Sequence, residues 1–402
     1  MATTAVAHDF PVLEREGLVY LDSAATAQKP RQVIDAMDDF LSHHNASVHR
    51  GVYPLMVEAT ERYEGARDRA ARFVGSTAGE TILTGNATQA INLVAQAWGR
   101  ANLQQGDRVV ITEMEHHSVI VPWHMICRER GAHLDVVGVD DEGQLLLEEL
   151  DAHLAKGPKL VAITHVSNVL GTINPIEEIA RRVHAAGALL LVDGSQAVPQ
   201  IPVDVAALDA DFYAWTGHKA YGPTGIGVLH GKREILEAMP PWIGGGHMIN
   251  RVSFEEITFA GVPARFEAGT SPIVEGVGLG AAVDFLSGIG IDAVRAHERS
   301  VTAYAMERLQ ELPGLTIHGP QDPGARGALV SFHLDHAHPH DVAEILGRQG
   351  VCVRAGHHCA QPLMKRLGIG ASTRASFAVH TTPDDVDRLV DALVEVHRIF
   401  GD

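Results

Sequence analysis

Short apolar segments alternate with helix-like segments from about residue 79 onward, and this alternation is the strongest constraint on the fold. The strand-like segments are RVVITEME (108–115), HLDVVGV (133–139), KLVAITHVSN (159–168) and ALLLVDGSQ (188–196). The segments between them, at 117–131, 145–155 and 176–187, are typical of amphipathic helices. Near-continuous apolar strands joined by helices predict an α/β fold, with a mostly parallel sheet that helices cover on both faces.

The pattern changes near residue 285, and a long helix is predicted over 291–312. Shorter strand-like and helix-like segments follow it, and they indicate a smaller α+β domain. No flexible linker marks the boundary. We therefore expect a large domain at 20–290, and a small domain made of 291–402 together with residues 1–19.

The composition limits the partners and compartments that are consistent with this chain. The 32 Lys and Arg residues and 50 Asp and Glu residues give a net charge of −18, which argues against nonspecific nucleic-acid binding. Cys127, Cys352 and Cys359 form no CxxC pair, which indicates a reducing compartment. The start lacks the pattern of a signal peptide, and no apolar run reaches membrane-spanning length. We expect a cytoplasmic protein without a membrane partner.

Polar residues follow three of the predicted strands, at 115–117, 165–168 and 193–196. In a parallel sheet such positions meet at one edge, where ligands bind. Lys219 lies downstream in WTGHKAYGPTGIG (215–227), among apolar and glycine residues. A lysine there and an aspartate such as Asp193 suit pyridoxal phosphate, because the amine bonds to the cofactor aldehyde and the carboxylate pairs with the ring nitrogen. Taken singly, the two residues are also consistent with a surface lysine and a turn aspartate.

Two further segments fit the same cofactor. TGNATQAINLVAQA (84–97) is a turn that enters an amphipathic helix, whose N-terminal N–H groups would bind a phosphate with help from Thr88. An ordinary helix cap explains this segment equally well. His116 follows a predicted strand and would lie against the cofactor ring. Metal binding is the alternative for this histidine, but EHHS lacks the i, i+4 histidine spacing of HExxH.

In order and spacing, these blocks resemble the SufS-type cysteine desulfurases, which are class V, fold-type I pyridoxal-phosphate enzymes. The matching blocks extend over nearly the whole chain, from YLDSAATAQKP (20–30) to STRASF (372–377), and include MEHHSVIVPW, HVSNVLGT, VDGSQA, GHKAYGPTGIG, FEAGT and VRAGHHCAQPLM. Each block is modestly specific, whereas their order and spacing are highly specific. The resemblance implies a homodimer that converts L-cysteine to L-alanine.

The resemblance also implies a role for individual residues. Lys219 would carry the cofactor, Asp193 would pair with its pyridinium nitrogen, and His116 would stack on its ring. The other cofactor contacts would come from Gln196 at the phenolic oxygen, from Ala87, Thr88, Thr216 and His218 at the phosphate, and from Thr270 of the partner subunit. The substrate carboxylate would be bound by Asn168, Arg354 and Arg374, and the sulfur would be accepted by Cys359 as a persulfide.

Two positions depart from the family pattern. Asn86 and Ala87 stand where relatives often have Gly-Thr, which removes one possible phosphate hydroxyl and leaves Thr88. His380 stands where relatives often have a tyrosine, and the sequence assigns no consequence to it.

The segment GHHCAQP (356–362) allows three interpretations of Cys359: a metal ligand, a buried structural thiol or a nucleophile. Because His357, His358 and Cys359 are consecutive, they coordinate one ion awkwardly, and we expect no resident metal. Gly356 and a proline indicate a loop rather than a core strand, which favours the nucleophile. Charge on the two histidines would then tune the thiolate.

Other functions remain open at this point. A selenocysteine lyase would use the same cofactor and fold, whereas a scaffold without catalysis would have lost Lys219, Asp193 or Cys359, and all three are present. The sulfur would pass to a SufU-type or SufE-type acceptor for iron–sulfur cluster assembly. HLDHAHPHDV (333–342) is either a solvated loop with a helix start or a docking edge for that acceptor, with His340 as the contact.

Overall fold

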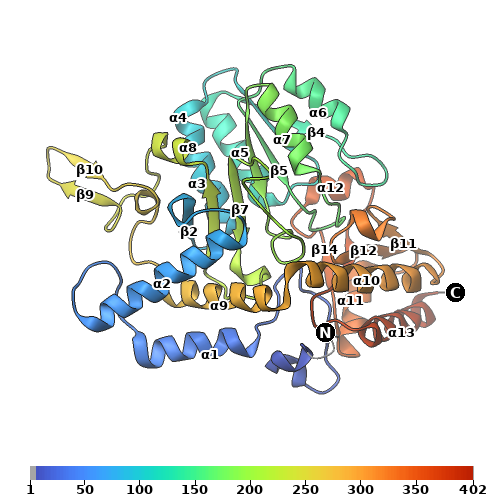
Figure 1. The fold of residues 1–402 in the computed structure, drawn as a ribbon. Coiled ribbons are helices and arrows are strands. Elements are labelled where there is room, and N and C mark those ends of the chain that lie inside the picture. The colour runs from blue at the N-terminus through green and yellow to red at the C-terminus, as the bar shows by residue number, and fades with distance from the viewer. Residues whose placement is uncertain (1–5, 402) are drawn as a thin grey trace.

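A seven-stranded sheet forms the centre of the computed structural model, which describes residues 6–401 (Figure 1). Its strands lie in the order β2 (Thr81–Thr84), β8 (Gly227–Gly231), β7 (Phe212–Thr216), β6 (Leu189–Asp193), β5 (Leu160–Thr164), β3 (Arg108–Thr112) and β4 (His133–Val137). Strand β8 runs antiparallel to β2 and β7, and the other neighbouring strands pair in parallel. The predicted α/β fold with a mostly parallel sheet is therefore confirmed.

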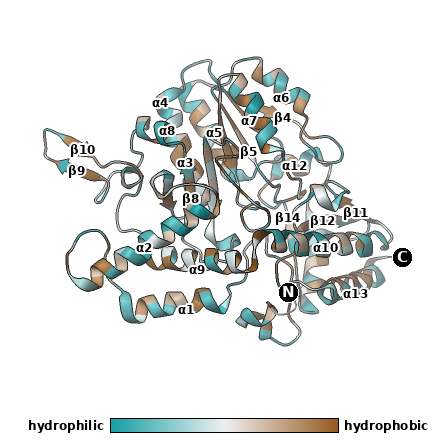
Figure 2. Ribbon diagram, in the orientation of Figure 1, coloured by the Kyte–Doolittle hydropathy of each residue, from teal (hydrophilic) through white to brown (hydrophobic). Residues whose placement is uncertain are grey.

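Helices cover both faces of this sheet, with polar residues on their outer sides and apolar residues along the strands (Figure 2). One face packs against α1 (Arg31–Asp39), α2 (Pro54–Phe73), α6 (Leu147–Leu154), α7 (Ile176–Ala185) and α9 (Ile273–Ile289). The other face packs against α3 (Ala87–Leu93), α5 (His117–Arg130) and α8 (Arg233–Ala238). Helix α3 continues through residues 94–99 into the short α4 (Arg100–Asn102).

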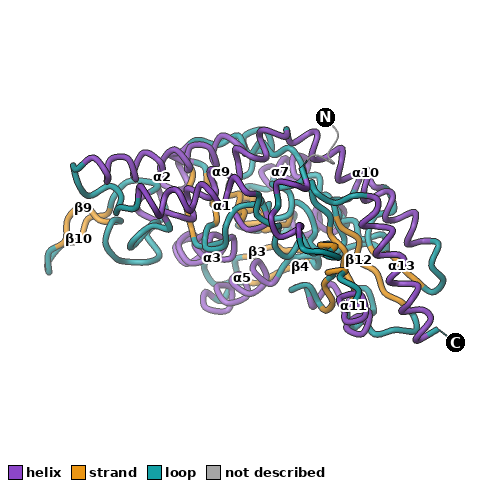
Figure 3. Tube along the Cα trace, turned by 90° about the horizontal axis from the view of Figure 1, so that it is seen from below, coloured by secondary structure: helices purple, strands orange, loops and turns teal. Residues whose placement is uncertain are grey.

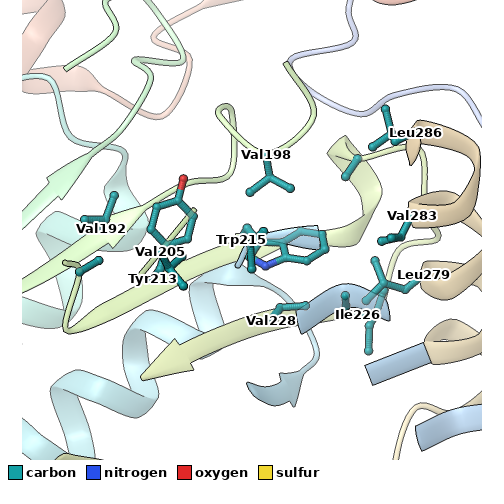
Figure 4. Packing of buried hydrophobic residues seen from close by; sticks show 14 of the residues in the cluster. Val192, Val198, Val205, Tyr213, Trp215, Ile226, Val228, Leu279, Val283 and Leu286 are labelled. Carbon is teal, nitrogen blue, oxygen red and sulfur yellow. The ribbon is translucent and has the colours of Figure 1, made fainter. Parts of the chain in front are cut away.

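The large sheet has a hydrophobic core on each face, and successive side chains of β7 point into the two cores alternately. Phe212 and Ala214 lie in the core on the α5 side of the sheet, whereas Tyr213 and Trp215 lie in the core on the α9 side. Figure 4 shows Trp215 between the sheet and α9, close to Leu279. Because a strand presents successive residues to opposite faces, a sheet covered on both faces needs continuously apolar strands. This requirement explains why the strand segments can be recognised in the sequence.

A second, antiparallel sheet lies beside the first, in the order β11 (Leu315–His318), β12 (Leu329–Leu334), β15 (Ser372–Ser376) and β14 (Arg354–Gly356). The helices of this part are α10 (Ile291–Gln310), α11 (Pro339–Arg348), α12 (Gln361–Arg366) and α13 (Pro383–Phe400). The short strands β1 (Val19–Tyr20) and β13 (Val351–Cys352) pair in parallel. Strands β9 (Ile249–Val252) and β10 (Ile257–Phe259) form a hairpin that projects from the body (Figures 1 and 3).

The predicted boundary near residue 290 falls on a sharp break between α9 and α10. Gly290 has a φ of 88°, in the region that favours glycine, and the two helices are bent by 76° relative to each other. Residues 1–5 of the small-domain assignment lie outside the described residues, and the division into two domains stays a prediction. Among residues 6–401, no single helix is long and apolar enough to span a membrane, although α9 and α10 meet that limit as a bent pair.

Leu286 of α9 tests this packing because its side chain is 0% exposed, in the core on the α9 side. We expect Leu286→Ala to lower the free energy of unfolding by about 2–5 kcal/mol, since it removes buried contacts and leaves a cavity. Urea denaturation followed by circular dichroism measures the change. The control is Ser287→Ala at the exposed next position of the helix, with an expected change within about 0.5 kcal/mol. Equal effects of the two substitutions would contradict the described core.

Candidate active site

A cavity of about 230 Å³ lies where the carboxyl ends of the parallel strands face the smaller sheet. Its walls contain twelve of the residues that the sequence singles out: Ala87, Thr88, His116, Asn168, Asp193, Gln196, Thr216, His218, Lys219, Arg354, Cys359 and Arg374. Residues more than 250 positions apart in sequence therefore meet at one site. Thr270 and His340 do not line this cavity.

Four neighbouring strand ends supply the side of the cavity that belongs to the large sheet. His116 follows β3, Asn168 follows β5, Asp193 ends β6, and Lys219 follows β7. This arrangement is the expected one, because parallel strands bring their carboxyl ends to the same edge of the sheet.

Lys219 ends a short 3-10 turn, Gly217–Lys219, directly after β7. The N–H of Gly217 donates to the carbonyl of Ile226 at 3.0 Å, which ties this turn to the residue before β8. Burial lowers the pKa of the Lys219 amine to about 8; the carboxylate of Asp193 opposes this shift, and the charge of Arg374 adds to it. More of the amine is therefore unprotonated near neutral pH than in an ordinary lysine, which suits a nucleophile or a base.

Asp193 places a carboxylate at the floor of the same cavity, with only 6% of the residue exposed. Its Oδ1 accepts a hydrogen bond from the backbone N–H of Ser195 at 3.0 Å, which fixes the orientation of the side chain. A buried carboxylate is stable only with donors or a positive charge nearby. A protonated ring nitrogen bound in the cavity would provide such a partner.

His116 is the N-cap of α5, and its ring orientation is determined by that cap. Nδ1 accepts a hydrogen bond from the N–H of Ser118 at 3.1 Å and lies 2.8 Å from the Ser118 hydroxyl. Burial, together with the charge of Lys219, lowers the pKa of His116 to about 4. The ring is therefore neutral at neutral pH, with its proton on Nε2 because Nδ1 is an acceptor.

The start of α3 and the end of β7 form a cradle for an anion. Asn86 is the N-cap of α3, and its side-chain oxygen accepts from the N–H of Gln89 at 2.9 Å. The N–H groups of Ala87 and Thr88 have no acceptor inside the helix, because they belong to its first turn. Within residues 6–401, the buried hydroxyl oxygen of Thr216 has no hydrogen-bond partner. The phosphate of pyridoxal phosphate would satisfy all of these donors, so the residues present fit this cofactor.

Gly227 of β8 lies directly behind this cradle. A Cβ at this position would collide with the backbone of Asn86, so only glycine allows β8 to approach the start of α3 so closely. His218 lines the cavity as well, and burial lowers its pKa to about 4, so it would meet an anion as a neutral ring. The departure at Asn86 therefore affects a helix cap, and Thr88 remains at the cavity wall.

Two arginines of the smaller sheet form the opposite wall. Arg354 of β14 and Arg374 of β15 are direct cross-strand partners. Arg374 is 1% exposed, and its Nη1 and Nη2 donate to the Asn168 carbonyl at 2.7 Å and to Asp22 Oδ1 at 3.3 Å. Its Nε has no partner in the described part of the chain. Burial lowers the pKa of Arg374 to about 10, so the group stays charged at neutral pH and can bind a carboxylate.

Gln196 and Asn168 use their amides for contacts within the protein. Gln196 Nε2 donates to the carbonyl of Ala24 at 2.8 Å. Asn168 Nδ2 donates to the carbonyl of His358 at 2.7 Å, in the loop that carries the cysteine. Their predicted contacts with the cofactor and the substrate stay predictions.

Cys359 lies on a loop that is held in an uncommon conformation. His358 and Cys359 have φ angles of 51° and 59°, in the left-handed region that non-glycine residues rarely adopt. The Asn168 amide holds the first of them, and the His117 N–H donates to the Cys359 carbonyl at 2.8 Å. Cys359 is partly exposed and lines the cavity. The interpretation as a buried structural thiol is therefore wrong.

The expectation that charge on His358 tunes this thiolate is also wrong. His358 is buried, and its Nε2 lies 3.0 Å from the Ser372 hydroxyl. Burial, with a contribution from Arg374, lowers the pKa of His358 to about 3, so the ring carries no charge at neutral pH. His357 is exposed, and its role stays a prediction. In the described part of the chain, no three His, Cys, Asp or Glu side chains are grouped to hold a metal ion.

Glu115 is a residue beside the site whose importance the sequence does not reveal. It is 0% exposed, and its Oε1 accepts from the Thr112 hydroxyl at 2.6 Å and from the Thr164 N–H at 3.1 Å. Burial raises the pKa of Glu115 to about 8. The carboxyl group thus links the ends of β3 and β5 immediately before His116. Its place after a strand is visible in the sequence, whereas its burial is not.

Three residues named in the sequence lie away from the cavity. Thr270 lines a separate cavity of about 270 Å³ that also contains Arg50. His340 is exposed in the first turn of α11, with its ring stacked on that of His338 at 5.4 Å. His380 is buried against the ring of Phe10. The contact of Thr270 across a subunit interface and the partner contact of His340 stay predictions.

Comparison with known proteins agrees with this geometry. Residues 19–389 match the family described as aminotransferase class-V. A probable cysteine desulfurase from Streptomyces coelicolor is 50% identical, with 99% of this chain and 98% of that protein covered. The solved structure of a cysteine desulfurase from Thermococcus onnurineus superposes with a TM-score of 0.95 at 37% identity, covering 98% of each chain. An Escherichia coli cysteine desulfurase structure gives a TM-score of 0.93 at 36% identity, covering 100% of this chain and 99% of that one. The chain therefore belongs to the class-V aminotransferase family, within its group of cysteine desulfurases.

Proposed function

We propose that this protein is a SufS-type cysteine desulfurase, which converts L-cysteine to L-alanine and carries the sulfur as a persulfide on Cys359. The observation that carries the proposal is the meeting of Lys219, Asp193 and Cys359 in one cavity. The names of the relatives that match the whole chain support the same activity.

Pyridoxal phosphate is the cofactor that we propose for this cavity. Lys219 would hold its aldehyde carbon, Asp193 its ring nitrogen, and the start of α3 with Thr216 its phosphate. When bound, the cofactor supplies an electron sink joined to the α-carbon of an amino-acid substrate. The neutral ring of His116, with its proton on Nε2, would stack on the cofactor ring.

The protein residues would then act on the substrate in turn. Arg374 and Arg354 bind the carboxylate of L-cysteine. The Lys219 amine takes the α-proton, because its lowered pKa keeps part of it unprotonated near neutral pH. The Cys359 thiolate attacks the substrate sulfur, so that an S–S bond forms and the substrate Cβ–S bond breaks, with its electron pair passing to the carbon skeleton. Protonation at Cβ and return of the α-proton release L-alanine and leave Cys359 as a persulfide.

The sulfur would leave through a partner protein. We propose a SufU-type or SufE-type acceptor, iron–sulfur cluster assembly as the destination, and the cytoplasm as the location. His340 supports this docking because it is exposed at the start of α11. A homodimer would bring Thr270 of the partner subunit to the phosphate, since Thr270 lies outside the cavity of its own chain. The thiol of Cys359 on the cavity wall favours a desulfurase over a selenocysteine lyase.

The role of Cys359 predicts a specific loss. We expect Cys359→Ser to abolish the formation of both L-alanine and the persulfide, because a hydroxyl does not replace the thiolate as the attacking group. Incubation with L-cysteine, alanine quantification and mass spectrometry of the loop peptide measure this loss. The matched control is Cys352→Ser, which changes a partly exposed cysteine outside the cavity. Alanine formation by Cys359→Ser at the control rate would refute the assigned role.

The close approach of β8 predicts a defect in cofactor retention. We expect Gly227→Ala to raise the Kd for pyridoxal phosphate by about tenfold or more, because an overpacked site costs about 1–3 kcal/mol and here displaces the start of α3. Titration of the cofactor-free protein by fluorescence measures this Kd. Gly244→Ala, an exposed glycine whose added Cβ meets nothing within 4 Å, is the control. A Gly227→Ala protein with the control's Kd would contradict the proposed cradle.

A further inference from the structure

Residues 19–29, here named the strap, contact several of the segments that surround the cavity. At its start the strap is attached to the segment that leads to the cysteine loop. The N–H of Val19 donates to the Gly350 carbonyl at 2.9 Å, and the N–H of Leu21 donates to the Cys352 carbonyl at 3.0 Å. These bonds belong to the pairing of β1 with β13.

The middle of the strap contacts both walls of the cavity. Asp22 accepts from Arg374 Nη2 at 3.3 Å, and the N–H of Ala24 donates to the Ser376 hydroxyl at 2.9 Å. The carbonyl of Ala24 accepts from Gln196 Nε2 at 2.8 Å. The strap thus joins β15 of the smaller sheet to the segment after β6.

The end of the strap converges on one backbone oxygen, the carbonyl of His218, which belongs to the peptide bond that leads into Lys219. Three groups donate to it: the N–H of Ala27 at 3.0 Å, the Thr26 hydroxyl at 3.3 Å and the Lys29 ammonium at 2.9 Å. A carbonyl oxygen has two lone pairs, so it commonly accepts one or two hydrogen bonds. The carbonyl of His218 instead accepts from three donors of one segment.

Lys29 is a partly buried cation whose acceptors are carbonyl groups. Within residues 6–401 no carboxylate lies within ion-pairing distance of it, and its other acceptor is the carbonyl of Ala27. Burial alone lowers the pKa of Lys29 to about 8, so the ammonium form predominates at pH 7. Its positive charge also lowers the pKa of His218. An ordinary surface lysine keeps its ammonium group in water, so its pKa would not be lowered and it would not lower the pKa of His218.

We propose that the strap sets the position of Lys219, and that Lys29 is the positioning residue through which it does so. Lys29 acts on the carbonyl of His218 and does not line the cavity. The inference rests on the proposed function, because it takes Lys219 as the reacting amine. It adds a second effect, in which the positive charge of Lys29 disfavours protonation of His218, the residue before Lys219.

Hydrogen exchange in the cofactor-free full-length protein tests the mechanical part. We expect amides of 217–222 to exchange about 2–10-fold faster in Lys29→Met than in wild type, the change that follows the loss of one hydrogen bond of ordinary net strength. Thr26→Val removes a neutral donor to the same oxygen and should act in the same direction. The control is Lys159→Met, an exposed lysine at the start of β5. Exchange at 217–222 equal to that of the control in both variants would overturn the inference, and Thr26→Val decides if Lys29→Met does not fold.

A pH titration of the cofactor-loaded protein tests the electrostatic part. The charged or titratable groups that face Lys219 are Asp193 of β6, His116 before α5, Cys359 of the loop, Arg354 of β14, Arg374 of β15 and Asp22 of the strap, with His218 beside it. All of these remain in both variants. We expect Lys29→Met to raise the pH midpoint of the bound cofactor's visible absorbance, because a nearby cation is lost, whereas Thr26→Val leaves it in place. A merely structural defect would lower the amplitude and keep the midpoint, and an unchanged midpoint in Lys29→Met would overturn this part.

The two proposals fail separately. Wild-type protein that forms L-alanine, with exchange and midpoint unaffected by Lys29→Met, would refute the positioning role alone. Faster exchange at 217–222 in both variants, in a wild-type protein that forms no L-alanine, would support the positioning role and refute the proposed function.

Discussion

Lys219 lies in a cavity where burial shields its amine from water. The other functional residues line the same cavity. Burial favours the uncharged amine, while the carboxylate of Asp193 favours the ammonium, so the pKa settles at about 8 rather than at an extreme. Two arginines on the opposite wall add positive charge, which prepares that side for a carboxylate. The edge of the sheet thus brings together the Lys219 amine, the carboxylate of Asp193 and a positively charged wall that can bind an anion.

The cysteine loop depends on the same site for its shape. Its left-handed residues, His358 and Cys359, are held from outside by the amide of Asn168 and the N–H of His117. Both of these donors follow strands of the large sheet. The position of the thiol is therefore set by the elements that also position the cofactor residues, which couples sulfur acceptance to the geometry of the cavity.

Local patterns made the sheet and the central residues predictable. Strands buried on both faces must be continuously apolar, so 108–112 and 188–193 stand out, and the polar residues after them identify the ligand-binding edge. Contacts between distant segments were not predictable. No local sequence pattern indicates that Glu115 is buried between Thr112 and Thr164. The neutral state of His358 depends on packing against Ser372, which GHHCAQP does not reveal.

The central claim is that the cavity keeps a larger fraction of the Lys219 amine unprotonated at neutral pH than in an ordinary lysine, so that more of it can act as nucleophile and base. Its most direct test is the pKa of this amine in the cofactor-free protein, measured from the rate of labelling by an amine-specific reagent at a series of pH values. Mass spectrometry of the peptide that carries Lys219 reports the rate at this residue. The account predicts a midpoint at about pH 8, and a midpoint at the ordinary lysine value of 10.5 would contradict it.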